Sequence, residues 1–181
     1  MKILDINKAV YRTRLNRVII GFIVGLALLS LGFGSMLISL FTDNTAVLSE
    51  IAGENGQTNN FKYNFLGVLL ALLACASILH RLKTTEFFHE VYYVWQLKQI
   101  HNQIYRKLKR IKKAAFADDD VNAMIILNYY YSSQKQVYLL DDNTLTMSVL
   151  NKVQQKLNAL LASKNITVEI EQFDIKTLAS Y

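Results

Sequence analysis

The chain has 181 residues, of which 20 are basic and 14 acidic, for a formal net charge of +6, and 52% are hydrophobic. This length suffices for one domain, or for a short membrane part with one small soluble part, and the positive charge admits anionic lipid or nucleic acid as a partner. The single cysteine, Cys75, excludes an intrachain disulfide and a multi-thiolate metal site, and the absence of proline favours long helices.

The first predicted element is a transmembrane helix over residues 18–41, preceded by a basic segment over residues 1–17. The 24 residues from Val18 to Phe41 carry no charge, and as a helix they extend for about 36 Å, enough to cross roughly 30 Å of hydrocarbon. A buried core helix of this kind needs a larger surrounding domain than the chain provides. A cleaved signal peptide is disfavoured because the large residues of LISLF stand where a small-residue cleavage site belongs.

A second transmembrane helix is predicted over residues 63–79, after a polar external loop over residues 42–62. Its 17 uncharged residues are near the lower limit for a span, and basic flanking side chains that reach the interface accommodate that length. The loop holds one basic residue, Lys62, and three acidic residues.

Basic residues flank the two spans on the sides away from the loop, and we expect them to face the anionic headgroups of a lipid bilayer. They are Arg12, Arg14, Arg17, Arg81 and Lys83. By the positive-inside rule, this asymmetry places both termini in the cytoplasm and the loop outside.

Small residues recur at intervals of four in both spans: Gly21 and Gly25 in the first, Gly67 and Ala71 in the second. Such spacing lets two helix backbones approach closely. The expected contact lies either within the hairpin or between two copies of the chain, and the sequence leaves both open. Neither span contains an ionisable residue, which disfavours a proton relay or an ion path.

Residues 84–163 are predicted to form a cytoplasmic module of three helices. Apolar residues at spacings of three and four indicate an amphipathic helix over about 86–114, continuing from the second span with little interruption. A second helix is expected over 121–140, capped by Asp118 or Asp119. A β-hairpin over the same residues is the alternative, because Ile, Val and Tyr favour strands.

A third helix is expected over about 145–163, with an apolar face at spacings of three and four. The tail, residues 164–181, alternates apolar and polar residues like a short strand, although it has no obvious partner. The predicted fold class is therefore all-α: a transmembrane helical hairpin of two spans, followed by a cytoplasmic three-helix module.

Three consecutive tyrosines, Tyr129, Tyr130 and Tyr131, form a candidate partner surface. On a helix they sweep about 200° around the axis. We therefore expect at least one ring to point away from the core, toward a protein partner.

The sequence contains no catalytic or cofactor-binding signature. The glycine-rich phosphate loop, the HExxH motif, a paired CxxC motif and the serine nucleophile elbow are all absent. Glu86-x-x-His89 has the spacing of one half of a di-iron helical site, but the remaining ligands are lacking. With His101, these are interpreted as polar surface residues, and we expect no enzyme activity, no metal, no cofactor and no small-molecule substrate.

A run of six basic residues over 106–113 precedes three aspartates at 118–120. The favoured interpretation is a corner between two helices, because cations stabilise a helix C-terminus and anions the next N-terminus. Contact with anionic lipid needs a bend near Thr84 and Thr85 that lays the helix on the membrane. Nucleic-acid binding is the least favoured of the three.

The chain contains, in this order, the segments INKAVYRTRLNRVI, LGFGSMLISLF, NFLGVLLALL and EVYYVWQLKQIHNQIYRKLKRI, with YLLDDNTLT further on. In this pattern it resembles an uncharacterised family of small two-span inner-membrane proteins of gammaproteobacteria, a domain of unknown function. The resemblance covers nearly the full chain and implies a multi-pass protein of a bacterial inner membrane. It carries over no catalytic residue.

Together these features predict a non-enzymatic inner-membrane protein whose cytoplasmic helical module mediates protein interaction or self-assembly. One alternative is an oligomeric small transporter or channel subunit, for which the spans offer only serine and asparagine side chains as a polar path. A further alternative is a membrane-anchored nucleic-acid binder that uses residues 106–113.

Overall fold

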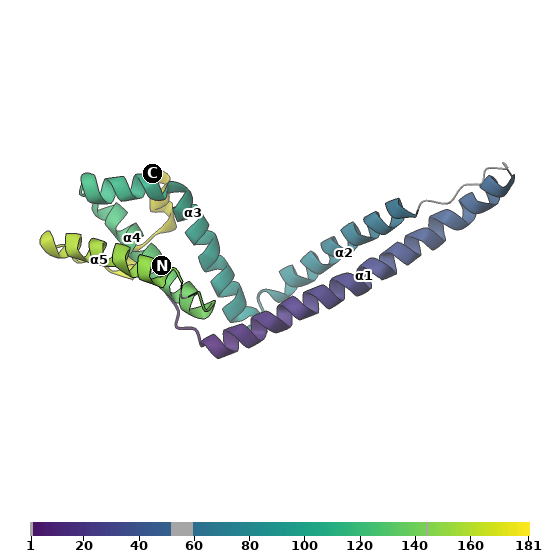
Figure 1. The fold of residues 1–181 in the computed structure, drawn as a ribbon, viewed down its shortest axis with the longest axis horizontal. Coiled ribbons are helices and arrows are strands. Elements are labelled where there is room, and N and C mark those ends of the chain that lie inside the picture. Colours follow the sequence, from purple (N-terminus) through teal and green to yellow (C-terminus); the bar gives the residue numbers. More distant parts are fainter. Residues whose placement is uncertain (1, 52–59, 144) are drawn as a thin grey trace. The chain divides into compact units, whose positions relative to one another are not determined.

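The computed structural model describes residues 2–51, 60–143 and 145–181, with the side chains of residues 42–51 excepted. These residues divide into two compact units (Figure 1). Residues 14–88 form the hairpin unit, and residues 2–13 together with 89–181 form the bundle unit. The described residues include no strand, so the all-α class is confirmed for them.

The hairpin unit is made of two long apolar helices and one short 3-10 helix. These are α1 (Lys8–Ile51, whose first turn and a half belong to the bundle unit), α2 (Phe61–Leu82) and η1 (Glu86–Phe88). In Figure 1, α1 and α2 run side by side in opposite directions. By length and composition, Lys8–Phe41 and Phe61–Leu82 are both able to cross a membrane.

α1 begins ten residues before the predicted span of 18–41. It starts behind Asn7, whose side-chain oxygen accepts hydrogen bonds from the backbone N–H groups of Ala9 (3.0 Å) and Val10 (3.2 Å). This cap satisfies two of the donors that a helix N-terminus leaves open. Because neither Gly nor Pro follows before the apolar span, the helix continues into it unbroken.

α1 also continues past the predicted span. Residues 42–51, which belong to the predicted 42–62 loop, are helical. Residues 52–59 of that loop lie outside the described residues.

The two hairpin helices approach each other closely at Gly34 and Gly67, both of which are buried. A Cβ built on Gly67 lies 2.6 Å from the backbone nitrogen of Gly34 and 3.2 Å from the carbonyl oxygen of Ser30. Only glycine permits this separation of backbones. Ala71 and Cys75 extend the buried face of α2 from Gly67 at the same spacing of four.

Within the hairpin, Gly21 and Gly25 do not make the predicted close contact, because a Cβ at either position meets nothing within 4 Å. The alternative, a contact between two copies of the chain, stays a prediction. The partner on α1 is instead the pair Ser30 and Gly34, which has the same spacing of four. The first span contains several small residues at this interval. Periodicity alone does not select the pair that faces the second helix.

The bundle unit is built around α4 (Val121–Leu140), which packs against α3 (His89–Ala117) and α5 (Met147–Ser163). Two 3-10 helices of the tail complete it: η2 (Ile170–Gln172) packs against α4, and η3 (Ile175–Ser180) packs against α3. Since α4 is apolar almost all round, it needs neighbours on several sides. Its core partners come from both flanking helices and from the tail, and they include Leu97, Ile104, Ile111, Leu157 and Phe173.

Residues 121–140 are a helix, as predicted, and not a β-hairpin. The N-cap is Asp120, not the predicted Asp118 or Asp119. The Asp120 carboxylate accepts hydrogen bonds from the backbone N–H groups two and three residues further on, at 2.8 and 3.3 Å. Asp119 has a left-handed φ of 56°, so the helix begins only after it, and its carboxylate pairs with Lys164.

The second apolar helix does not run on into the amphipathic one. α2 ends at Leu82, and α3 begins at His89 after a turn and η1. The backbone N–H of Thr85 (3.0 Å) and its hydroxyl (2.7 Å) both donate to the carbonyl oxygen of Leu82. These bonds satisfy a free carbonyl at the end of α2 and stop the helix there.

The tail over 164–181 is not the short strand that was predicted. Its alternating segment has no neighbouring strand among the described residues, and the chain turns at once into η2 and η3. η2 is closed by a capping box, in which the Gln172 side chain accepts from the backbone N–H of Glu169 at 2.9 Å. Phe173 then stacks on Tyr129 with ring centroids 4.1 Å apart.

Gly67→Val should separate the two hairpin helices, because the added side chain meets backbone atoms of Gly34 that cannot yield. We expect a loss of roughly 1–3 kcal/mol in the free energy of unfolding, as for other overpacked sites. The measurement is thermal unfolding in detergent by circular dichroism. Gly32→Val is the matched control, since a Cβ at Gly32 meets nothing within 4 Å; equal effects of both changes would contradict the assigned contact.

Asp120→Ala should destabilise the bundle unit by about 1 kcal/mol, the usual cost of a lost N-cap. It also removes the acceptor of the Tyr181 hydroxyl, 2.6 Å away. Asp118→Ala, at an exposed position two residues earlier, should change stability by about 0.5 kcal/mol or less. Thermal unfolding of the two variants distinguishes the observed cap from the predicted one.

Candidate functional site

The hairpin unit has an apolar cavity of about 300 Å³ between α1 and α2, open on one side as a groove. Its walls come from the first part of α1, the last turns of α2 and η1. The lining residues are Arg17, Val18, Gly21, Phe22, Gly25, Leu29, Cys75, Ile78, Leu79, Leu82, Phe87 and Phe88. The volume is at the lower end of the range for ligand pockets, about 300–1,000 Å³.

The two predicted packing glycines on α1 line this cavity. Gly21 and Gly25 bring no side chain into the space between the helices, and nothing from α2 fills it. Their spacing of four places both on one face of α1. The cavity therefore exists because these positions lack a side chain.

η1 bounds one end of the cavity, and Arg14 holds it there. The Arg14 guanidinium donates to the carbonyl oxygen of Glu86 at 2.8 Å and lies 5.8 Å from the centroid of the Phe87 ring. Phe87 and Phe88 meet edge to face, with centroids 5.4 Å apart. Arg17, one turn further along α1, lines the cavity with an exposed side chain.

Two others of the predicted headgroup-facing residues lie at the end of α2. Arg81 is exposed there, and the ammonium of Lys83 lies 3.3 Å from Nδ1 of His80. The fifth, Arg12, has a different setting in the bundle unit.

In the bundle unit, the start of α1 is joined to the end of α4 by a polar clamp. Lys8 and Arg12 both pair with the Asp142 carboxylate. Lys98 pairs with Asp141 at 2.7 Å. The hydrogen bond from Lys8 holds the pKa of Asp142 below its usual value. We use the name N-terminal clamp for Lys8, Arg12, Lys98, Asp141 and Asp142.

The bundle core contains a histidine–serine pair that the sequence did not indicate. Nε2 of His101 lies 2.7 Å from the Ser133 hydroxyl, which in turn donates to the Tyr129 carbonyl oxygen at 2.7 Å. Burial lowers the pKa of His101 to about 4, and the charge of Lys98 adds to that effect. His101 is therefore half-buried against α4 and does not lie on a fully solvated face as predicted. Since Ser133 is fully buried, a substrate has no access to it, and the pair is structural.

The prediction of an outward-facing tyrosine is wrong, because Tyr129, Tyr130 and Tyr131 are all buried. α4 is covered by α3, α5 and the tail, so a sweep of 200° does not bring any of these rings to the surface. Burial raises the pKa of Tyr131 to about 12. These residues belong to the core and offer no partner surface.

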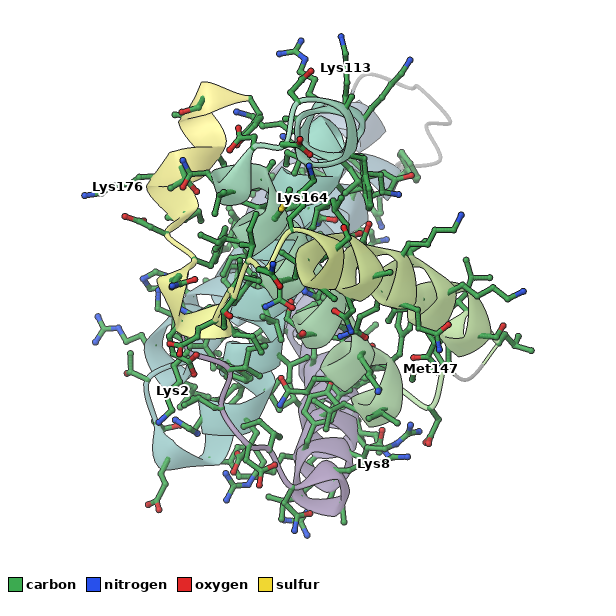
Figure 2. All side chains as sticks on the ribbon, turned by 90° about the vertical axis from the view of Figure 1, so that its left-hand side faces the viewer. Lys2, Lys8, Lys113, Met147, Lys164 and Lys176 are labelled. Carbon is green, nitrogen blue, oxygen red and sulfur yellow. The ribbon has the colours of Figure 1, made fainter. Side chains whose placement is uncertain are left out.

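The basic segment over 106–113 lies inside α3, which continues to Ala117 with no basic residue in its last turn, and this segment holds the tail. Lys107 donates to the carbonyl oxygen of Leu178 at 2.6 Å, and Arg110 donates to that of Tyr181 at 2.8 Å. Lys113 points away from the ribbon (Figure 2). Among the described residues, no group of three or more His, Cys, Asp and Glu side chains is placed to hold a metal ion, and Glu86 and His89 belong to no such group.

Acidification should destabilise the bundle unit through His101. Between pH 6.5 and about 4 the unfolded state binds a proton that the folded state does not, so the free energy of unfolding falls as the pH drops through 6.5. From pH 7.5 to 5 we expect a loss of about 2 kcal/mol. The measurement is the thermal midpoint of near-ultraviolet circular dichroism in detergent at both pH values.

His101→Gln is the control for this pH effect, because glutamine does not titrate and retains a hydrogen-bonding side chain. The variant should show a much smaller difference between the two pH values. Asp142 does not confound the comparison, because its pKa is lowered from 3.8 and its ion pairs persist at pH 5. An undiminished pH effect in the variant would show that another group is responsible.

A family model described as "Protein of unknown function (DUF3087)" matches residues 1–178. The match includes both units. No curated protein and no solved structure matches the chain.

Proposed function

The chain belongs to the family described as protein of unknown function (DUF3087), so its role has to be inferred from the structure. We propose that it is a non-enzymatic integral membrane protein whose bundle unit is a cytoplasmic interaction module. In this proposal α1 and α2 form a transmembrane hairpin in a bacterial inner membrane. The bundle unit, with its three helices α3, α4 and α5, mediates self-assembly.

The observation that carries the proposal is the exposure of apolar side chains on α1 and α2. In their most apolar stretches only 6% and 17% of the residues are buried inside the protein. Leu31 on α1 is 71% exposed and Leu73 on α2 is 66% exposed. A core helix of a water-soluble protein buries such residues, whereas in a bilayer they contact lipid chains.

The orientation rests on the distribution of basic residues. Arg14 and Arg17 precede the apolar part of α1, and Arg81 and Lys83 end α2. Since α1 and α2 run in opposite directions, these residues share one end of the hairpin unit (Figure 1). An excess of Lys and Arg favours the cytoplasmic side.

A surface for self-assembly is the corner between α4 and α5. Leu139, Leu145 and Val149 are exposed large apolar residues at this corner, and Leu145 is 91% exposed. We call these three residues the apolar corner. In a symmetric dimer the same patch of both copies meets, so a single exposed apolar patch on each chain is sufficient.

The two alternatives have less support. A transporter or channel needs a polar path, but the cavity of the hairpin unit is lined by apolar residues apart from Arg17. A nucleic-acid binder would use residues 106–113, where Lys107 and Arg110 already bind carbonyl oxygens of the tail.

Single-cysteine labelling tests the membrane topology. On a Cys75→Ala background, Glu54→Cys should react with a membrane-impermeant maleimide in intact spheroplasts, and Lys176→Cys only after permeabilisation. The opposite pattern would reverse the orientation. Recovery of the protein in the carbonate-soluble fraction would refute membrane insertion itself.

Photocrosslinking tests the apolar corner. A photoreactive residue at Leu145 in the full chain should yield a covalent dimer in membranes, while one at Gln155, an exposed polar position on α5, should not. Leu145→Asp with a second probe at Val149 should remove the dimer. A crosslinked product of another mass, or equal dimer yields at both positions, would contradict self-assembly through this corner.

A further inference from the structure

We propose that the cavity of the hairpin unit binds one acyl chain of an anionic phospholipid, whose phosphate lies against Arg17. This inference rests on the proposed membrane insertion of α1 and α2. It adds a specific lipid site to a hairpin that otherwise meets lipid only through its outer surface.

The dimensions of the cavity fit one leaflet of a bilayer. Its lining on α1 runs from Arg17 to Leu29, which is about 18 Å along the helix axis. Half of the hydrocarbon thickness is about 15 Å. An acyl chain whose headgroup is level with Arg17 would therefore follow the cavity along its length toward the middle of the bilayer.

The shape of the helix pair explains why lipid rather than protein fills this space. At Gly34 and Gly67 the backbones are in contact and leave no room. At Gly21 and Gly25 nothing lies within 4 Å of the Cβ position, and the facing side chains are those of α2 and η1. Inside a bilayer, lipid acyl chains surround the two helices, so an acyl chain is the molecule that can occupy this apolar cavity.

The charges select an anionic lipid. Arg17 is exposed, and among the described residues it has no hydrogen-bond or ion-pair partner. Arg14 differs, because it already binds the carbonyl oxygen of Glu86. A guanidinium binds phosphate oxygens through two parallel hydrogen bonds, so Arg17 is placed to hold a headgroup at the mouth of an apolar chain site.

The test uses the full chain in nanodiscs that contain equal amounts of phosphatidylglycerol and phosphatidylcholine. The protein is then extracted into mild detergent, and the lipids that remain bound are identified and counted by native mass spectrometry. The wild type should retain one phosphatidylglycerol per chain in preference to phosphatidylcholine.

Gly25→Leu fills the cavity and should reduce lipid retention to the background of loosely bound lipid. Gly32→Leu is the matched control, because Gly32 is also open to 4 Å, lies on α1 and does not line the cavity. It should retain lipid like the wild type. Arg17→Gln leaves the apolar walls intact, so it should still retain a lipid but lose the preference for phosphatidylglycerol.

Equal retention by the wild type, Gly25→Leu and Gly32→Leu would overturn the lipid site. So would retention of the two lipids in proportion to their supply, or replacement of the bound lipid by a second copy of the chain. Gly21→Ala, which adds only one methyl group to the cavity wall, provides a milder variant if Gly25→Leu fails to fold. Because carbonate extraction separately reports membrane insertion, failure of this inference is distinguishable from failure of the proposed function.

Discussion

The bundle unit depends on the enclosure of α4, a helix with almost no polar face. Ten of its 20 residues are buried, and two neighbouring helices do not provide enough surface to cover them all. The tail therefore folds back so that Phe173 stacks on Tyr129. At the other end of the chain, the Tyr93 hydroxyl accepts from the backbone N–H of Leu4 (2.9 Å), which brings the N-terminal segment onto the same unit. The three-helix description is thus incomplete without both ends of the chain.

The hairpin unit follows a different physical rule. Its two helices expose most of their apolar side chains and touch through a narrow line of small residues around Gly34 and Gly67. In the proposed bilayer setting, exclusion of water does not hold such a pair of helices together, and close backbone contact takes its place. Glycines also leave the cavity open beside Gly21 and Gly25, where the two backbones are no longer in contact and no side chain fills the gap. Tight packing and a cavity are two results of one small-residue pattern.

The helices of this chain are largely predictable from sequence, because hydrophobic periodicity and the absence of proline act locally. The start of α4 was missed by one or two residues, since three consecutive aspartates offer the same cap and only Asp120 has the extended backbone of an N-cap, after the left-handed Asp119. Burial of Tyr129 was also missed. The direction of its side chain on α4 follows from the local helix geometry, but the residue that covers it, Phe173, comes from the tail.

Of the residues that line the candidate site, the sequence singled out Arg17, Gly21 and Gly25, but it did not indicate their roles in a cavity. The spacing of Gly21 and Gly25 was visible, yet the choice between contact and cavity depends on which face of α1 meets α2. In this structure Ser30 and Gly34 are the α1 residues that contact α2 at Gly67, and this contact fixes which face of α1 meets α2. The N-terminal clamp had no local signal at all, because its partners are far apart in the chain.

The N-terminal clamp has a consequence for how the protein is made. Lys8 is separated from Asp142 by 134 residues, so during synthesis the start of α1 leaves the ribosome roughly 7–27 s before its partner, at about 5–20 residues per second. For that interval Lys8 and Arg12 lack the carboxylate that they bind in the folded chain, and both apolar helices are complete before the bundle unit is. In the proposed membrane protein the hairpin is therefore able to insert before the bundle unit folds, and the clamp cannot close until Asp142 has been synthesised.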